Sequence, residues 1–280
     1  MVISTDADGL LSAAFLHHHL GWKVAGYYDS EILWLSTLTD SQAKQLVWID
    51  LDVCNPACPA LGHHLLTLTA DVPSALNHIC NPNLLAGIGR DTYTSKYPFS
   101  TIIFLLWLHE IALRRDLLAR LLVLHADSSW SNYQQYRDNC RSWQQRLPGY
   151  DWNWLFRQVD SDDFNKLITA QLYPLLERLG AIPGQALTGS PSPESIGGQL
   201  RFNPDWDEDI ILGVYTLVGT YLKWSPPAVP EITRRLAGDR RTAKLNPGSA
   251  KDFIDDLLDS DVFSYAIVNR DTINFTHLDW

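Results

Sequence analysis

Two acidic residues near the start of the chain, placed between a strand-like run and a helix-like run, constrain the fold most. Residues 2–5 form a short apolar start, residues 6–9 read Asp-Ala-Asp-Gly, and residues 10–20 have helix-forming composition. Carboxylates two residues apart, just past a strand, can both point at one metal cluster, and glycine allows the chain to turn there. The alternative is an ordinary Asp N-cap. A calcium loop is excluded, because the next residues lack its further ligands and closing Glu.

Further predicted strands lie close to acidic residues or histidines. One strand is predicted at residues 23–28 and is followed by Asp29. A second is predicted at residues 45–51 and contains Asp50, and a short third one is expected at 65–68. Strands and a helix in this order predict a parallel α/β sheet. Ligands bind beyond the carboxyl ends of such strands. Asp6, Asp8, Asp50 and His63 fall there, and Asp52 is an equal candidate to Asp50 on pattern alone.

Histidines and one further acid complete the candidate set. Gly62-His63-His64 precedes the third predicted strand. Neutral imidazole is a common ligand for transition metals, although an isolated pair also occurs packed or on the surface. Asp127 follows a long apolar helix, and it is either a ligand or the N-cap of a helix starting near Asn132.

In this order, the elements resemble the DHH phosphoesterase superfamily. That superfamily includes RecJ-type exonucleases, oligoribonucleases, cyclic-dinucleotide phosphodiesterases and manganese-dependent inorganic pyrophosphatases. The stretch STDADGLLSAAFL is close to its first motif, and the resemblance covers roughly residues 1–130. The resemblance implies bound Mn²⁺, or Mg²⁺, and a catalytic His64 facing the substrate phosphate. It also implies a first metal and catalytic role for Asp6, and a second metal held by Asp8, Asp50, His63 and Asp127.

Two departures from the family pattern leave two functions open. Ser4 or Val2 stands where the family usually has a His or Asp ligand, and Gly62 stands where it has the Asp of Asp-His-His. The glycine-rich motif of the family's second domain is also missing, since residues 196–199 lack its His. One function is metal-dependent hydrolysis of a phosphodiester. The other is a catalytically weakened homologue that binds a nucleotide or a protein.

Basic residues suggest where a substrate binds. The loop 77–98 carries Arg90 and Lys96, and Arg suits bidentate phosphate contact. The alternative is a surface loop with two solvated cations. A second cluster could bind nucleic acid or an acidic partner, although a solvated helix face is the commoner explanation. It comprises Arg234, Arg235, Arg240, Arg241 and Lys244.

The amino-acid composition limits which partners and which surroundings the chain is expected to have. A formal net charge of −10 argues against binding along duplex nucleic acid, which needs a basic footprint. A nucleotide or a short single strand fits better, and a homodimer or a partner subunit is compatible with the chain. The 4 cysteines make no disulfide scaffold and are expected to be buried thiols. No apolar stretch reaches the roughly 18 to 20 residues of a membrane span, so a cytoplasmic protein without membrane contact is expected.

The expected organisation is linear. Residues 1–130 form the DHH-like α/β metal-binding domain, residues 131–181 a helical connector, and residues 182–280 a smaller α+β region. The chain is expected to be largely helical from residue 98, with a linker at 182–198 rich in Pro, Gly and Ser. Helices are then expected at 208–223, 230–237 and 250–258. Two β-rich runs, 263–268 and 272–278, predict a terminal hairpin.

Overall fold

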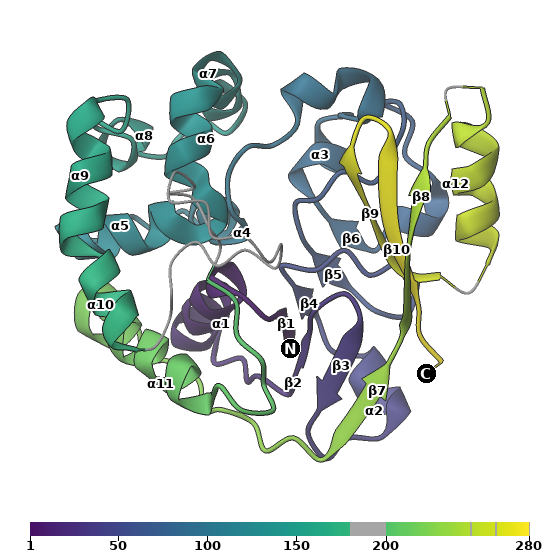
Figure 1. Ribbon diagram of the computed structural model, residues 1–280, viewed down its shortest axis with the longest axis horizontal. Helices are drawn as coiled ribbons and strands as arrows, with labels where there is room; N and C mark the ends of the chain where they lie inside the picture. Colours follow the sequence, from purple (N-terminus) through teal and green to yellow (C-terminus); the bar gives the residue numbers. More distant parts are fainter. Residues whose placement is uncertain (180–199, 247, 261, 280) are drawn as a thin grey trace. The chain divides into compact units, whose positions relative to one another are not determined.

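The computed structural model describes residues 1–179, 200–246, 248–260 and 262–279 (Figure 1). The chain forms two compact units, each assembled from separate segments. The sheet unit comprises Met1–Ser4, Val24–Tyr97 and Pro230–Trp280, and the helical unit comprises Thr5–Lys23 and Pro98–Val229. This division differs from the linear one expected from the sequence, because the chain leaves the sheet twice and returns to it twice.

A seven-stranded sheet organises the sheet unit, in the order β6-β5-β4-β1-β2-β3-β7. The strands β6, β5, β4, β1 and β2 are parallel neighbours, β3 is antiparallel to β2, and β7 is antiparallel to β3. A mostly parallel α/β sheet was expected, and this prediction is confirmed. The strands are β1 (Val2–Ser4), β2 (Gly26–Tyr28), β3 (Ile32–Leu35), β4 (Trp48–Ile49), β5 (Ala60–Leu61), β6 (Ile79–Cys80) and β7 (Arg234–Ala237).

A second, three-stranded antiparallel sheet has the order β8-β10-β9. Its strands are β8 (Asp239–Lys244), β9 (Val262–Asn269) and β10 (Thr272–His277). The predicted terminal hairpin is therefore confirmed as β9 and β10. Helical segments of the sheet unit are α2 (Asp40–Lys44), η1 (Ser74–Leu76), α3 (Pro82–Leu85), η2 (Arg90–Ser95) and α12 (Ala250–Asp259).

Aromatic packing joins the two sheets of this unit. The rings of Tyr28, Trp48 and Phe263 meet edge to face, with centroids 5.2 to 6.0 Å apart. The Tyr28 hydroxyl lies 2.7 Å from the Ser264 hydroxyl, and the Cys54 amide donates to the Phe263 carbonyl at 2.7 Å. Offset aromatic pairs add stability beyond their buried area. The strand β9 therefore anchors the loop that follows β4.

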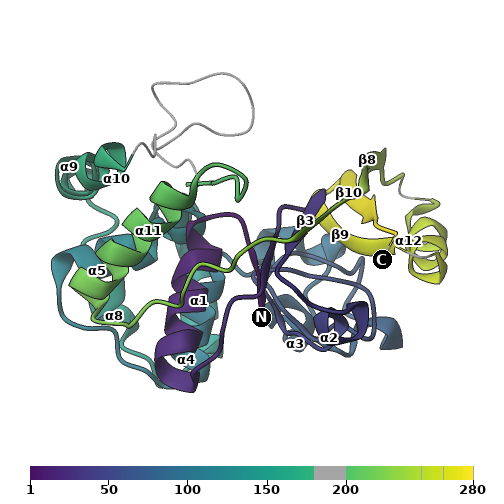
Figure 2. The same cartoon turned by 90° about the horizontal axis from the view of Figure 1, so that it is seen from below.

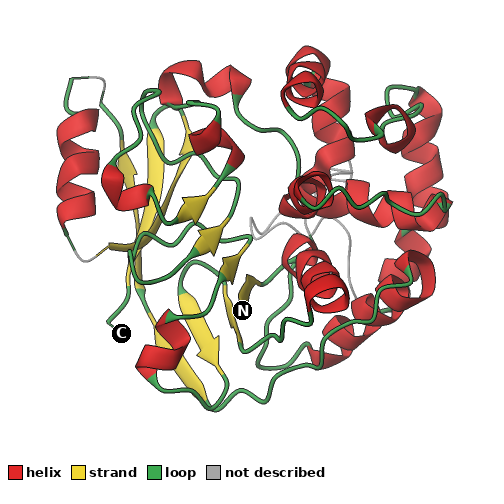
Figure 3. Ribbon diagram, turned by 180° about the vertical axis from the view of Figure 1, so that it is seen from behind, coloured by secondary structure: helices red, strands yellow, loops and turns green. Residues whose placement is uncertain are grey.

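The helical unit contains only helices among its named elements, as Figure 3 shows in red. The helix α1 packs against both α4 and α11 (Figure 2). Among the described residues, no helix is both long enough and apolar enough to cross a membrane. The helices are α1 (Ala7–Leu20), α4 (Thr101–Leu108), α5 (Leu117–His125), η3 (Ala126–Ser128), α6 (Ser129–Gln135), α7 (Arg137–Arg146), α8 (Trp152–Leu155), α9 (Asp162–Gln171), α10 (Tyr173–Arg178), α11 (Glu208–Leu217) and the π-helix η4 (Val218–Leu222).

The strand expected at residues 65–68 is wrong. That segment has no strand, and the strand of this region is β5, which lies before the two histidines. The segment satisfies its carbonyls elsewhere: Leu65 accepts from the Ile267 amide, and Leu66 accepts from the Tyr265 hydroxyl. Because β5 comes first, His63 and His64 lie at its carboxyl end.

The helix expected at residues 230–237 is also wrong, because this segment holds the strand β7. Its side chains alternate between half-buried and exposed, as they do in an edge strand. The second basic cluster therefore lies on β7 and β8 and not on a helix face. The Arg235 guanidinium lies over the Trp34 ring, 5.8 Å from its centroid. The predicted linker at 182–198 lies outside the described residues.

Candidate metal centre

One edge of the seven-stranded sheet collects the candidate residues of the sheet unit. Because β1, β4, β5 and β6 are parallel, their carboxyl ends share this edge. Ser4 ends β1, Asp50 directly follows β4, Gly62 follows β5 and Asn81 follows β6. The prediction that Asp50 and His63 follow strands of a parallel sheet is confirmed in this unit.

Asp50 is held in an unusual backbone conformation. Its φ angle is 60°, in the left-handed region that non-glycine residues seldom adopt. The Asp50 amide donates to the Leu61 carbonyl at 2.7 Å, which ties this conformation to β5. The carboxylate is buried, accepts from the Ser4 hydroxyl at 2.6 Å, and lies 3.4 Å from His63 Nδ1. Strained residues fixed by their surroundings are concentrated at functional sites.

Asp52, the equal candidate on sequence pattern, has a different set of partners. Its Oδ2 atom accepts from the His64 amide at 3.0 Å and contacts His64 Nδ1 at 2.9 Å. Its Oδ1 atom accepts from Asn81 Nδ2 at 2.8 Å. A carboxylate can only accept, so the His64 Nδ1 atom carries the proton in this pair. The structure thus separates the two acids, with Asp50 beside His63 and Asp52 bound to His64.

The two histidines are held through their backbones. Asn83 donates to the His63 carbonyl at 2.7 Å, and Asn81 donates to the His64 carbonyl at 2.8 Å. Both asparagines are buried, and the two imidazole rings stack with centroids 4.8 Å apart. His63 is 14% exposed and His64 is 47% exposed. Both asparagines lie within the loop 77–98 that was predicted to contact a substrate, and an Asn-Pro-Asn after a strand was the signal for this structural role.

In the helical unit, Asp8 is hydrogen-bonded to the start of α4. Its Oδ2 atom accepts from the Thr101 amide at 2.6 Å, and its Oδ1 atom accepts from the Ile102 amide at 2.8 Å. The first amides of a helix have no partner within the helix, and the helix dipole favours an anion there. Asp8 is only 1% exposed. Its carboxylate is therefore fixed in place by the backbone of α4.

Asp127 lies in the tight turn between α5 and α6. Its φ angle is 47°, and that of Ser128 is 52°. The turn is braced by the Ser129 hydroxyl, which donates to the Ala126 carbonyl and accepts from the Ser100 amide. The residue that precedes α6 is Ser128, so the alternative of Asp127 as the cap of the next helix does not hold.

Four of the predicted residues form a group that could bind a metal ion. Asp8, Asp50, His63 and Asp127 each offer one ligand atom, and these atoms all lie within 4.8 Å of one another. Oxygens on opposite sides of a divalent ion are about 4.2 to 5.2 Å apart, twice the usual ion–oxygen distance. Three carboxylates repel one another at such separations, and a cation offsets that repulsion. The residues therefore fit a divalent metal, whose identity they do not determine.

The other predicted residues have different placements. Asp6 is the N-cap of α1, accepting from the Gly9 amide at 3.1 Å, and it is not part of the four-residue group. The Arg90 side chain is 15% exposed, and its Nη1 atom is buried without a hydrogen-bond partner among the described residues. Lys96 donates to the Tyr93 hydroxyl at 3.1 Å. Neither basic side chain is a freely solvated cation.

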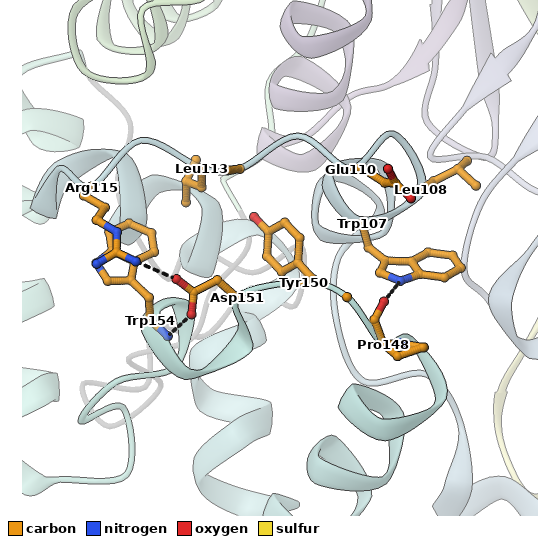
Figure 4. Close-up of a pocket in the computed structure, with 11 residues that line it drawn as sticks. Trp107, Leu108, Glu110, Leu113, Arg115, Pro148, Tyr150, Asp151 and Trp154 are labelled. Carbon is orange, nitrogen blue, oxygen red and sulfur yellow. Dashed lines mark hydrogen bonds and ion pairs between the residues drawn. The ribbon is translucent and has the colours of Figure 1, made fainter.

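A hollow within the helical unit does not involve the predicted residues. The hollow has a volume of about 330 Å³, and Trp107, Tyr150 and Trp154 are among the residues that line it (Figure 4). Arg115 and Asp151 form an ion pair at its rim, with 2.9 Å between nitrogen and oxygen. Burial raises the pKa of the Tyr150 hydroxyl, so this group stays protonated. Apart from Glu110 and Asp151, the side chains that line this hollow include no ionised nucleophile or base.

All four cysteines are free thiols; Cys54, Cys58 and Cys140 are buried as expected, whereas Cys80 is only half-buried. Burial raises the pKa of Cys58 to about 11 and that of Cys140 to about 12, so both stay protonated thiols. They are inert packing residues and supply no thiolate ligand. The candidate centre is therefore one of oxygen and nitrogen donors. No family model, curated protein or solved structure matches this chain.

Proposed function

We propose that this chain is a divalent-metal-dependent phosphoesterase, a divergent relative of the DHH superfamily. The observation that carries the proposal is the group of Asp8, Asp50, His63 and Asp127, the same four residues that the sequence resemblance assigns to one metal. Three carboxylates and one imidazole favour manganese, with magnesium as the alternative. These four side chains would hold the ion.

A bound divalent cation would supply a Lewis acid that stabilises negative charge on a phosphate group. The protein's own contribution is orientation. Asp50 is fixed by its strained backbone and by Ser4, and Asp8 is fixed by the amides of α4. Each carboxylate is thus oriented by contacts within its own unit, and such preorganisation is a large part of enzymatic rate enhancement.

His64 is the proposed proton-transfer residue. Its Nδ1 atom holds a proton against Asp52, and its side chain is half-exposed. The Nε2 atom is therefore the ring nitrogen that would accept or donate a proton at a phosphoester oxygen. Asp6 has no such role in this proposal, because its carboxylate caps α1.

The proposed substrate is a small nucleotide or a short single strand. The net charge of −10 opposes contact with a long polyanion. Within the sheet unit, Arg90 is the proposed phosphate contact, because a guanidinium suits a phosphate oxygen; its Nη1 atom is buried, so the side chain would turn outward to bind. Arg90 also lines a shallow hollow with Asp91, Arg270 and Asp271.

Calorimetric titration with manganese tests the proposal. The wild-type chain is expected to bind at least one ion, and Asp50→Ala is expected to lose that binding because a central ligand is gone. Asp71→Ala, which removes an exposed acid of the same unit, is the matched control and should bind as the wild type does. Equal binding by wild type and Asp50→Ala would falsify the site.

Turnover is tested separately, with manganese and a panel of short oligonucleotides and cyclic dinucleotides. The wild type is expected to hydrolyse at least one phosphodiester, and Asp50→Ala none. Tight manganese binding without turnover on any member of the panel would favour the other function, a weakened homologue that binds a nucleotide or a protein. The departures at Ser4 and Gly62 are the observations that favour this second function.

A further inference from the structure

The space beside Gly62 is occupied by another residue's carboxylate. A Cβ atom added to Gly62 would lie 2.5 Å from Asp52 Oδ2 and 2.6 Å from both Asp52 Cγ and Oδ1. Side-chain atoms do not approach one another so closely. The φ angle of Gly62 is not among the positive values, so its backbone does not require glycine. A larger side chain at position 62 would therefore need the Asp52 carboxylate to move.

We infer that Asp52 supplies, from the loop after β4, the carboxylate that a side chain at position 62 would otherwise supply, and that it positions His64. The carbon atom next to a Cβ is about 1.5 Å away. The carboxyl carbon of an acid at position 62 can therefore fall within about 1 Å of the present Asp52 carboxyl carbon, given the 2.6 Å separation. An acid at position 52 and an acid at position 62 would therefore place a carboxylate at nearly the same point.

The contacts of Asp52 define what this carboxylate does. It binds the His64 amide and Nδ1 through one oxygen and Asn81 through the other. Asn81 is fully buried and also donates to the His64 carbonyl. The acid thus fixes both the ring orientation of His64 and the nitrogen that carries its proton. Asp52 is a positioning residue, because it acts on a substrate only through His64.

Only the predicted effect of Asp52 on turnover rests on the proposed function. The positioning of His64 by Asp52 is inferred from the contacts around Gly62 and does not need that function. The test therefore combines an activity readout with two readouts that need no activity, the thermal unfolding midpoint and the nitrogen NMR shifts of His64.

The experiment moves the carboxylate within the chain of 280 residues. Asp52→Ala removes it, Gly62→Asp adds a second one to an occupied space, and the double variant Asp52→Ala/Gly62→Asp relocates it. Asp52→Ala/Gly62→Ala is the matched control, because it fills the space without restoring an acid. Asp52→Asn, which keeps the shape of the side chain, serves if Asp52→Ala does not fold.

The expected results follow from the overlap between the Asp52 carboxylate and any side chain at position 62. Gly62→Asp alone should lower the unfolding midpoint, since two carboxylates cannot share the space. At about pH 8.5, where an ordinary imidazole is neutral, the wild-type His64 should carry its proton on Nδ1. Asp52→Ala and the alanine control should lose this preference, and the double variant Asp52→Ala/Gly62→Asp should regain it.

Turnover should follow the same pattern. Asp52→Ala should lower kcat about tenfold or more while KM and manganese affinity change less than about threefold, and relocation of the acid should recover most of the loss. If the double variant is no better than Asp52→Ala in NMR and in unfolding midpoint, the inference is wrong even if the wild type is active. If those two readouts recover while the wild type has no activity, the inference stands and the proposed function fails.

Discussion

The pairs Asp50–His63 and Asp52–His64 are built from the same residue types at the ends of β4 and β5, yet they differ in their surroundings. Asp50 has a left-handed backbone, and its side chain belongs to the four-residue group. Asp52 has both carboxylate oxygens bound to His64 and Asn81. The first histidine is 14% exposed and the second 47%. This difference is the basis for proposing a metal-binding role for the first pair and a proton-transfer role for the second.

The largest expected effect separates the two histidines. His63→Ala should weaken manganese binding by more than about 100-fold, because it removes a ligand, whereas His64→Ala should leave the affinity within about threefold. His64→Ala should instead lower kcat by about 10²- to 10⁴-fold, the usual contribution of a proton-transfer residue. Calorimetry measures the first quantity and steady-state kinetics the second.

The exposed His109 supplies the control, and His109→Ala should change neither quantity. If His64→Ala loses manganese as completely as His63→Ala does, the division of labour between the two pairs is wrong.

A second comparison concerns the acids Asp8 and Asp50 without metal. Asp8→Asn should lower the free energy of unfolding by about 1 kcal/mol in the presence of a chelator, because Asp8 accepts two amides at the start of α4. Asp50→Asn should change it by less than about 0.5 kcal/mol, since Asn keeps an acceptor for Ser4 and tolerates the left-handed backbone. Urea unfolding measures both.

Both variants should lose manganese binding, so the chelator experiment isolates the structural role of each acid. A larger loss of stability for Asp50→Asn than for Asp8→Asn would show that Asp50 is chiefly structural.

The family resemblance of the ordered motifs predicted the four-residue group, whereas local patterns predicted only its separate members. An acid after an apolar run, or a histidine beside a short strand, is visible within about ten residues, and the parallel sheet then brings Asp50 and His63 to one edge. The choice between Asp50 and Asp52 was not predictable, because both follow the same strand. It depends on which histidine each acid meets, and that requires the register of β4 against β5, which pair at only two positions.

The two wrong predictions, a strand at residues 65–68 and a helix at 230–237, both concern segments whose structure depends on residues distant in the sequence. The strand β5 has only two residues and no alternation to detect, so the strand was expected after His63 and not before it. The strand β7 contains adjacent arginines, and its β conformation is set by pairing with β3, some 200 residues earlier in the chain. The carboxylate beside Gly62 comes from Asp52, ten positions earlier, so no local pattern around Gly62 reveals it.

The smallest expected effect concerns Ser4, which stands where the family resemblance places a metal ligand. Its hydroxyl donates to Asp50 Oδ2 at 2.6 Å, so it orients a ligand and need not be one. Ser4→Ala should weaken manganese binding about tenfold, the usual effect of losing an outer hydrogen-bond partner, and kcat at saturating manganese should change little. Ser12→Ala is the matched control, because its hydroxyl lies at a longer 3.4 Å from Asp8 Oδ1, and it should have a smaller effect. An unchanged affinity in Ser4→Ala would mean that the backbone alone orients Asp50. A loss as large as that of His63→Ala would instead make Ser4 a direct ligand.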